Sequence, residues 1–369
     1  MKMKAAIARE YNKPISVEEV ELAPPKEKEV LVKTSYCGFC HSDLSLIKGH
    51  FQFPLPAVMG HEASGVVMDV GPGVTKLQKG DHVVGTWMIS CGDCPECAKG
   101  WGNLCRTNLS GVHEGTLLDM TSRLTDAEGN TLRHSTFVSG FAEYMVLPEE
   151  GAIKVRKDMP LDQACFLGCC MPTGFGSAVN VGKVNAGESV AIWGMGGVGL
   201  NVVQGCKMRG AYPIIGVDLE GSKEAIAREF GATHFIDSSK EDPVPIIQEL
   251  TNGGANYCFE VIGDSGAGKQ CFWSLGLKGK MVQVGGPHPE DMADIPFIFL
   301  GIHCQSVEGT VYGNIRTHED IPKFIDMVMR GDYKLDKLLG KYFKLDEIND
   351  VVDAMEKRQI IGRWVCAFE

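Results

Sequence analysis

The chain has 369 residues, of which 44% are hydrophobic and 22% charged, and its formal net charge is −11. This length predicts two domains of roughly 150 to 200 residues each, and the composition predicts a soluble globular protein. The negative charge, without a cluster of Lys and Arg, argues against binding along a nucleic-acid backbone. No apolar run approaches the roughly 20 residues of a membrane span, and residues 1–9 lack a secretory signal, so we expect no membrane partner and a cytoplasmic location.

Residues 5–90 alternate short apolar runs with Gly and Pro, for example Val30-Leu31-Val32 and Gly65-Val66-Val67. Many short strands separated by turns predict a barrel-like β domain. Residues 69–74, with two glycines and a proline, predict a turn between two of these strands.

Potential metal ligands gather within residues 37–62. Cys37 and Cys40 stand close together, His61 follows, and a Cys169-Cys170 pair comes later. Thiolates and an imidazole suit a zinc ion that keeps one position open for a substrate. The polar neighbours of these residues suit the hydrogen bonds that orient such ligands. The alternative is that they are ordinary buried residues, since free cysteine is often buried. Chemistry alone does not separate Cys37 from Cys40, or Cys169 from Cys170.

A second cysteine group has the spacing of a closed metal site. Four cysteines are separated by two, two and seven residues in a loop rich in Gly and Pro: Cys91, Cys94, Cys97 and Cys105. Such a set can close a tetrahedral cage that stabilises its lobe and leaves no position for chemistry. The alternative, four unrelated thiols, is disfavoured because free loop cysteines are prone to oxidation.

The pattern changes at residues 189–193, which predict a buried strand. Residues 194–199 follow as Gly-Met-Gly-Gly-Val-Gly and open a helical run. A second strand, residues 214–217, ends at Asp218, nineteen residues after Gly199. Strand, glycine turn, helix, strand and acid in this order predict dinucleotide binding. Asp218 would hold the ribose hydroxyls and repel a 2′-phosphate, which favours NAD over NADP. The alternative is a glycine-rich turn beside a surface aspartate.

Helices and strands continue to alternate after Asp218. We expect helices at 222–230, from 243 onward and around 268–275, and strands at 234–236, 257–261 and 281–284. This rhythm predicts a doubly wound parallel sheet. Further on, Thr317-x-x-Asp320 predicts the capped start of a helix, and apolar residues at helical spacing predict a second helix over 348–355.

With these motifs the chain resembles, nearly end to end, the zinc-dependent medium-chain dehydrogenase family of the alcohol dehydrogenases. The resemblance implies an α/β protein with a GroES-like catalytic domain at 1–170 and 314–369, including a zinc lobe at 91–105. It also implies a Rossmann NAD-binding domain at 171–313. The implied activity is hydride transfer between a primary or secondary alcohol, or its aldehyde or ketone, and NAD.

Two alternatives to this activity stay open. One is a zinc-containing reductase of a conjugated carbonyl or C=C bond, which the presence of Ser42 and Glu62 argues against. The other is a zinc-folded binding protein without catalysis, which would tolerate the loss of Cys169 or Asp218. Neither residue is lost.

The resemblance also assigns roles to residues. It implies a catalytic zinc held by Cys40, His61 and Cys169 and a structural zinc held by the four-cysteine group, hence two zinc ions per subunit. Ser42 takes the alcohol proton, Glu62 approaches the metal, and Asp43 accepts a hydrogen bond from the ligand histidine. The usual relay histidine is replaced by Ser45, and His50 is the candidate substitute.

The remaining implied contacts concern cofactor, substrate and oligomer. The cofactor contacts are His41, Thr173, Gly194, Gly196, Gly197, Val198, Gly199, Asp218, Lys223, Val284 and Arg363. The substrate pocket comprises Phe51, Trp87, Ser110 and Val311, and Trp87 suggests a slim or planar small molecule. Leu109 stands where glutathione-dependent relatives carry an arginine, which argues against that substrate. The family implies a homodimer or homotetramer joined at sheet edges near residues 302–313.

Overall fold

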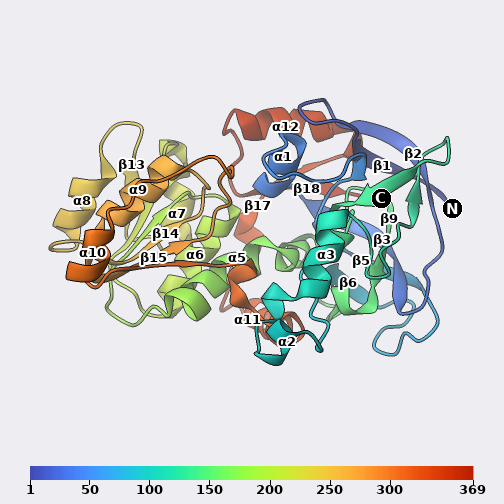
Figure 1. Cartoon of the computed structure of the whole chain (residues 1–369), viewed down its shortest axis with the longest axis horizontal. Helices are drawn as coiled ribbons and strands as arrows, with labels where there is room; N and C mark the ends of the chain where they lie inside the picture. Colours follow the sequence, from blue (N-terminus) through green and yellow to red (C-terminus); the bar gives the residue numbers. More distant parts are fainter. Residues whose placement is uncertain (369) are drawn as a thin grey trace. The chain divides into compact units, whose positions relative to one another are not determined.

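A computed structural model describes residues 1–368. It divides the chain into two compact units, one comprising Met1–Cys170 with Arg316–Glu369 and the other Met171–Ile315. Figure 1 labels many of the elements of each unit by the names used below.

The first unit contains a closed barrel with the strand order β1-β2-β7-β8-β4. Its strands are β1 (Lys2–Ala8), β2 (Ser16–Leu22), β4 (Ala57–Val58), β7 (Leu124–Thr125) and β8 (Thr131–His134). Alternate residues of β1, Met3, Ala5 and Ile7, are buried in one apolar cluster, as the two-residue period of a strand requires. The barrel-like domain predicted from the sequence is confirmed.

A second sheet in this unit joins distant parts of the chain. Its order is β10-β6-β5-β3-β18-β17, with β9 also paired to β3. The strands are β3 (Glu29–Gly38), β5 (Glu62–Val70), β6 (His82–Gly85), β9 (Tyr144–Pro148), β10 (Ala152–Val155), β17 (Leu339–Phe343) and β18 (Arg363–Ala367). The antiparallel pairing of β18 with β3 carries the C-terminal segment to the segment that precedes Cys40.

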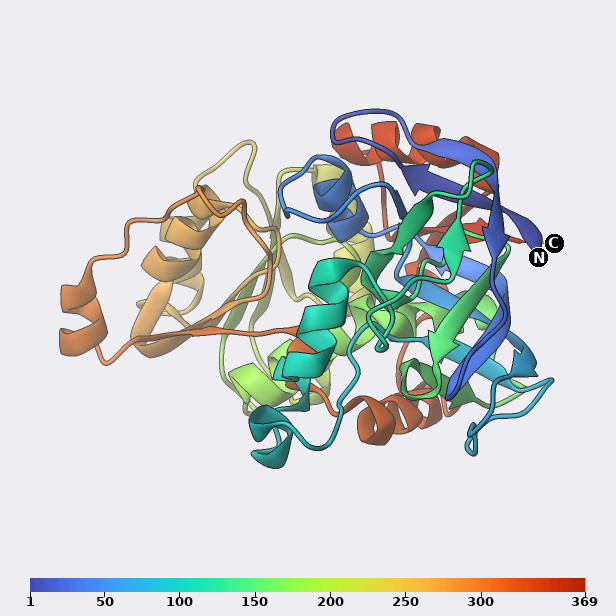
Figure 2. The ribbon, with the colours of Figure 1, turned by 45° about the vertical axis from the view of Figure 1, so that its right-hand side comes forward.

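The helices of the first unit pack around these sheets. They are α1 (His41–Ile47), α2 (Pro95–Ala98), α3 (Arg106–Glu114), α4 (Leu161–Ala164), α11 (Thr317–Met329) and α12 (Ile348–Glu356). The amphipathic helix predicted over 348–355 is confirmed, because α12 buries Ile348 and Val351 in the main apolar cluster. Figure 2 shows α12, in red, beside the blue N-terminal segment, where Asn349 hydrogen-bonds the backbone of Ile15.

The predicted cap of α11 was wrong. The helix begins at Thr317, and Arg316 is the residue that precedes it as N-cap. The Thr317 hydroxyl donates instead to the Met88 carbonyl at 2.9 Å, so it is not available to cap the helix. Asp320 accepts from the Arg316 backbone N–H at 2.8 Å.

The second unit is built on a parallel sheet with the strand order β13-β12-β11-β14-β15-β16. The strands are β11 (Val190–Trp193), β12 (Ile214–Asp218), β13 (His234–Asp237), β14 (Ala255–Glu260), β15 (Leu275–Gln283) and β16 (Ser306–Gly309). Counted in chain order the pattern is 3-2-1-4-5-6, that of a doubly wound dinucleotide-binding sheet. The fold class predicted from the alternating pattern is confirmed.

In the second unit α5 precedes the sheet, and the other helices lie between successive strands. The helices are α5 (Cys170–Gly176), which begins at the last residue of the first unit and continues as a π-helical segment Ser177–Gly182, then α6 (Gly197–Met208), α7 (Glu224–Phe230), α8 (Pro243–Leu250), α9 (Ser265–Trp273) and α10 (Phe297–Ile302). Helices α6, α7 and α9 contact the sheet (Figure 1). Helix α8 begins at Pro243, as the sequence predicted, and Asp242 caps it by accepting from the Val244 backbone N–H.

In residues 1–368, each helix taken singly is too short or too polar to cross a membrane. The bent pair Leu161–Gly168 and Cys170–Gly182 meets the criteria of length and composition only.

Candidate functional site

Three buried side chains of the first unit form a potential metal centre. Cys40 precedes α1, His61 precedes β5, and Cys169 follows the turn at 165–168. One ligand atom from each lies within 4.8 Å of the others. Two thiols and an imidazole this close together are a donor set that zinc accepts, with a fourth position left for another ligand.

Cys37 and Cys170, which residue chemistry alone did not exclude as metal ligands, make other contacts. The Cys37 thiol donates to the Gly38 carbonyl, and the Cys170 thiol donates to the Phe166 carbonyl, both at 3.8 Å. Burial raises the pKa of both thiols, but the pKa of Cys169 is raised as well, so these contacts and not the pKa separate the two cysteines from the potential ligands. This separation could not be read from residue types.

Asp43 orients two of the three potential ligands. Its Oδ1 lies 3.0 Å from His61 Nδ1, and its Oδ2 accepts from the Cys40 backbone N–H at 2.9 Å. The same contact to Cys40 helps to start α1. Burial acts to lower the pKa of His61, but the Asp43 carboxylate outweighs it and raises that pKa. With Nδ1 engaged, Nε2 of His61 is left to bind a metal.

A buried ion pair stands beside this cluster. Glu62 is 0% exposed and Arg363 4% exposed, and Arg363 Nε lies 3.0 Å from Glu62 Oε2. Glu62 Oε1 also accepts from the Cys170 backbone N–H at 2.8 Å. Burial raises the pKa of Glu62, while the guanidinium opposes that rise. Gly38 makes room for the pair, because a Cβ there would lie 2.4 Å from Glu62 Oε2.

The Cys40 thiol has an environment that favours ionisation. A hydrogen bond from Cys169, followed by the charge of Arg363, lowers its pKa well below the usual range. Ser42 lies on α1 with its Oγ 3.8 Å from Cys40 Sγ, and its side chain is exposed. His41 and His50 are also exposed, whereas Ser45 is buried.

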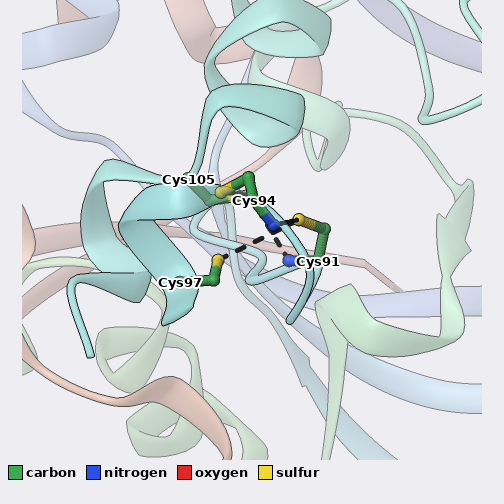
Figure 3. A group of neighbouring side chains, drawn as sticks. All are labelled: Cys91, Cys94, Cys97 and Cys105. Carbon is green, nitrogen blue, oxygen red and sulfur yellow. Dashed lines mark hydrogen bonds between the residues drawn. The ribbon is translucent and has the colours of Figure 1, made fainter. Parts of the chain in front are cut away.

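The four cysteines of the second group converge, as Figure 3 shows. Their sulfur atoms lie within 4.8 Å of one another. Cys94 and Cys105 precede α2 and α3, so helix starts help to position them. The Cys91 backbone N–H donates to Cys105 Sγ at 3.3 Å, and hydrogen bonds, that of Thr107 first, lower the pKa of Cys91 to about 6. Four sulfur donors fit a closed zinc site.

In the second unit the glycine-rich turn lies between β11 and α6. Gly194 has a φ of +100°, and a Cβ at Gly199 would lie 1.7 Å from the Gly194 carbonyl oxygen. Gly196 precedes the helix, and nothing lies within 4 Å of its would-be Cβ. Close packing at Gly199 and open space at Gly196 suit a turn whose backbone N–H groups receive a phosphate.

Asp218 stands at the carboxyl end of β12 beside this turn. Its Oδ2 accepts from the Met195 backbone N–H at 2.7 Å. Lys223 Nζ lies 3.0 Å from the same oxygen. A ligand held by Asp218 would therefore lie close to the glycine-rich turn.

The other predicted site residues are less concentrated. Thr173 lies on α5, Val198 on α6, and Val284 directly after β15; Gly197 begins α6. Phe51 and Trp87 pack against the main apolar cluster of the first unit, and Val311 belongs to the second unit. The Ser110 hydroxyl donates to the Arg106 carbonyl within α3 at 3.0 Å, so that bond is local.

The sequence motifs did not indicate two further carboxylates at the same edge of the parallel sheet. Asp237 ends β13, and the buried Glu260 ends β14. Glu260 accepts from the backbone N–H groups of Ile262 and Gly263. The available signal was an acid directly after a buried apolar strand, the same signal that identified Asp218.

Known proteins resemble the chain over nearly its whole length. Residues 26–157 match the alcohol dehydrogenase GroES-like domain, and residues 197–330 match the zinc-binding dehydrogenase domain. Alcohol dehydrogenase class-3 of Cereibacter sphaeroides is 35% identical over 373 residues, which cover 98% of each chain. The chain belongs to the zinc-dependent medium-chain dehydrogenase family.

Solved structures agree with this membership. An alcohol dehydrogenase zinc-binding domain protein from Burkholderia ambifaria is 36% identical, with a TM-score of 0.94 over 100% of this chain and 99% of that one. Benzyl alcohol dehydrogenase from Acinetobacter calcoaceticus is 33% identical, with a TM-score of 0.91 over 100% of both chains. This dehydrogenase is therefore an oxidoreductase that uses zinc and a nicotinamide cofactor.

Proposed function

We propose that this dehydrogenase transfers a hydride between a primary or secondary alcohol, or its aldehyde or ketone, and NAD. The observation that carries the proposal is the cluster of Cys40, His61 and Cys169, with ligand atoms within 4.8 Å. An exposed hydroxyl, that of Ser42, lies 3.8 Å from one of these thiols. A zinc ion with three protein ligands keeps a fourth position for a substrate oxygen, and an adjacent hydroxyl suits alcohol chemistry.

The two cysteine-containing clusters would each hold one zinc ion, two per chain. A zinc ion held by Cys40, His61 and Cys169 would supply Lewis-acid stabilisation of negative charge on the substrate oxygen. Asp43 keeps His61 oriented for this role, and Glu62 with Arg363 supplies a charged pair beside the cluster. The four-cysteine cluster would stabilise the lobe at residues 91–105.

The chain's own contribution to proton transfer begins at Ser42. Its hydroxyl accepts the alcohol proton as the hydride leaves the substrate carbon, and passes a proton onward. Ser45 is buried and stands where relatives carry a histidine, so the exposed His50 is proposed as the group that releases the proton to solvent.

Residues 171–313 would form the NAD-binding domain, and residues 1–170 with 314–369 the catalytic domain. The glycine-rich turn at residues 194–199 would receive the pyrophosphate, and Asp218 with Lys223 the adenosine ribose. His41, Thr173, Val198, Val284 and Arg363 are the remaining proposed cofactor contacts. The Asp218 carboxylate favours NAD, since a 2′-phosphate placed there would be repelled.

Within alcohols we propose slim or planar substrates. Phe51, Trp87, Ser110 and Val311 are the proposed pocket residues, and Trp87 is the bulkiest of them. The relation to a benzyl alcohol dehydrogenase supports a planar substrate. Reduction of a conjugated carbonyl or C=C bond is the second candidate function, and the Ser42 hydroxyl favours the first.

We also propose a cytoplasmic homodimer or homotetramer. Strand β16 pairs with β15 on one side, and its four residues are exposed. An exposed edge strand of this kind suits pairing with a second copy. Light scattering of the purified protein would distinguish a monomer, which contradicts this proposal, from the two oligomers.

The function is tested with the purified chain, a panel of alcohols, aldehydes and ketones, and both nicotinamide coenzymes, followed by nicotinamide absorbance. Elemental analysis should find two zinc ions per chain, one for each cluster. Ser42→Ala should lower kcat by roughly 10²- to 10⁴-fold with the zinc content unchanged.

Ser16→Ala is the matched control, because Ser16 lies on β2 and its hydroxyl donates to the Ile7 carbonyl at 3.3 Å, and it belongs to neither cysteine-containing cluster. It should leave kcat unchanged. Undiminished turnover in Ser42→Ala would exclude the proposed role of Ser42 in proton transfer. Reduction of conjugated carbonyls without any alcohol oxidation would favour the second candidate function.

A further inference from the structure

The carboxyl edge of the parallel sheet carries two adjacent strand-ending carboxylates. Strand β12 ends at Asp218 and β13 at Asp237, and these residues are direct partners in the sheet register. Each holds a lysine from the segment that follows it. Lys223 Nζ lies 3.0 Å from Asp218 Oδ2, and Lys240 Nζ lies 2.6 Å from Asp237 Oδ2. Each of these two ammonium groups is therefore paired with a carboxylate.

The second pair lies against the turn that follows Asp218. A Cβ at Gly221 would lie 2.7 Å from Asp237 Oδ2 and 3.7 Å from Lys240 Nζ. Gly221 begins the short turn that ends at Lys223. The Lys240 ammonium therefore lies beside the backbone between Asp218 and Lys223, although Lys240 itself belongs to the loop that follows β13.

In the Asp237–Lys240 pair the carboxylate is more firmly positioned than the ammonium. The Ser239 backbone N–H and hydroxyl donate to Asp237 Oδ1 at 3.2 and 2.5 Å. The Asp237 side chain is 15% exposed, whereas that of Lys240 is 76% exposed. Hydrogen bonds thus fix the position of the Asp237 carboxylate, and the ion pair restrains the long, exposed side chain of Lys240.

We propose that Asp237 is a second determinant of coenzyme choice in this dehydrogenase, because it keeps the Lys240 ammonium from binding the 2′-phosphate of NADP. The inference rests on the proposed function, which places the adenosine ribose at Asp218. A phosphate monoester carries nearly two negative charges near neutral pH and needs unpaired cations. At this edge both lysines are paired, and the Glu220 carboxylate adds another negative charge.

The two carboxylates have separable effects. Asp218 accepts from the Met195 and Glu220 backbone N–H groups, so its replacement disturbs the glycine-rich turn and the ribose contacts together. The hydrogen bonds of the Asp237 side chain stay within residues 237–240. Replacing Asp237 should therefore change binding of NADP(H) and leave that of NAD(H) unaltered.

The test is the dissociation constant of NADPH and of NADH, measured by isothermal titration calorimetry on the full chain. Asp237→Asn should lower the Kd of NADPH roughly 3- to 10-fold, since one unpaired ammonium near a surface phosphate gives a modest, solvent-screened gain. The Kd of NADH should stay within about twofold, and raising the salt concentration should shrink the gain.

Two further variants identify the cation responsible. Asp237→Asn combined with Lys240→Met should return the Kd of NADPH to the wild-type value. Lys240→Met alone should leave it within about twofold, because the wild-type ammonium is already paired. Asp294→Asn is the control for net charge, since it removes one carboxylate from the exposed Lys269–Asp294 pair of the same unit.

An unchanged Kd of NADPH in Asp237→Asn would overturn the inference, as would a gain that persists without Lys240 or appears equally in Asp294→Asn. Weaker NADPH binding in Lys240→Met alone would also overturn it, because Lys240 would then already bind the phosphate. A wild-type chain that binds NADPH more tightly than NADH would contradict the NAD preference itself, which is a separate result from failure at Asp237.

Discussion

The two cysteine-containing clusters of the first unit obtain their geometry in different ways. Cys40, His61 and Cys169 are buried and come from three distant segments, and charged side chains of Asp43, Glu62 and Arg363 surround them. The four-cysteine cluster comes from residues 91–105 of one loop, and backbone N–H groups donate to its sulfurs. The first cluster depends on the tertiary fold, whereas the second organises the loop that contains it.

This difference suits different tasks. A cluster whose position is set by packed strands can keep a coordination site open without collapsing, because the surrounding fold holds the ligands apart. A loop with little apolar surface of its own needs a closed site to become ordered. Removing a ligand of the first cluster should therefore abolish activity, and removing a ligand of the second should lower the stability of the protein.

The largest expected effect is on activity in Cys169→Ala. Loss of one of three ligands should remove the first zinc and lower kcat/KM by roughly 10⁴-fold or more, since the proposed alcohol oxidation depends on Lewis-acid stabilisation. Kinetics, elemental analysis and thermal unfolding on one preparation check this, and the lobe zinc should remain. Cys37→Ala is the matched control, a buried cysteine on β3, and should keep full zinc content. If activity were retained without the first zinc, the proposed difference between a catalytic and a structural cluster would be wrong.

The second prediction concerns Cys105→Ala. Cys105 is fully buried at the start of α3, so its loss should release the lobe zinc and lower the free energy of unfolding by on the order of 4 kcal/mol. Denaturant unfolding and zinc analysis measure both quantities. Cys37→Ala should cost about 1 to 2 kcal/mol as an ordinary buried side chain. Equal losses in the two variants would show that the lobe does not depend on its metal.

The same contrast explains what the sequence could predict. The four-cysteine spacing and the glycine-rich turn were recognisable because their parts are close in the chain, and local spacing determines local geometry. The alternating helices and strands were predictable for the same reason, and their parallel sheet is confirmed. Thr317 was misassigned as a cap because its hydroxyl is claimed by Met88, which is remote in sequence.

Contacts between distant segments lay beyond residue patterns. The pairing of β18 with β3 brings Arg363 to Glu62, and no spacing in the sequence indicates that pair. The register of β12 and β13, which sets Asp237 beside Asp218, was also not readable, because each strand shows only an apolar run ending in an acid. Register depends on the side chains of both strands and on the turns between them.

A third prediction sharpens the role of the charged surroundings. Asp43→Asn keeps the size of the side chain but weakens its hydrogen bond to His61 Nδ1. The affinity for the first zinc should fall roughly 10- to 100-fold, the range for loss of an orienting partner of a ligand histidine. Competition with a chelator measures this affinity, and the lobe zinc serves as the internal standard. Equal weakening of both sites would mean that Asp43 acts on general stability.

A fourth prediction concerns pH, and it compares His61 with a second buried imidazole of the same unit, that of His134. His134 Nε2 accepts from the Arg123 backbone N–H at 3.1 Å, and Nδ1 lies 3.2 Å from the Ser139 hydroxyl. Burial, followed by the charge of Arg123, lowers the pKa of His134 to about 3. The Asp43 carboxylate acts in the opposite direction on His61. Two buried histidines thus differ because one faces a carboxylate and the other a guanidinium.

The pH dependence follows from the sign of the His134 shift. Its folded pKa of about 3 lies below the unfolded value of roughly 6.5, so between these values the unfolded chain binds the additional proton. The contribution of neutral His134 to stability is complete above pH 6.5 and falls as the pH decreases towards 3. Between pH 7 and 5 the loss should be about 2 kcal/mol.

His134→Gln should remove this part of the pH dependence, whatever its effect on stability at pH 7, because glutamine does not titrate. Denaturant unfolding of wild type and variant at pH 7, 6 and 5 measures the difference in slope. Parallel stability curves for the two proteins would show that His134 is protonated in the folded state as readily as in the unfolded chain. In that case burial beside Arg123 would not distinguish this imidazole from an exposed one, and the contrast with His61 would rest on Asp43 alone.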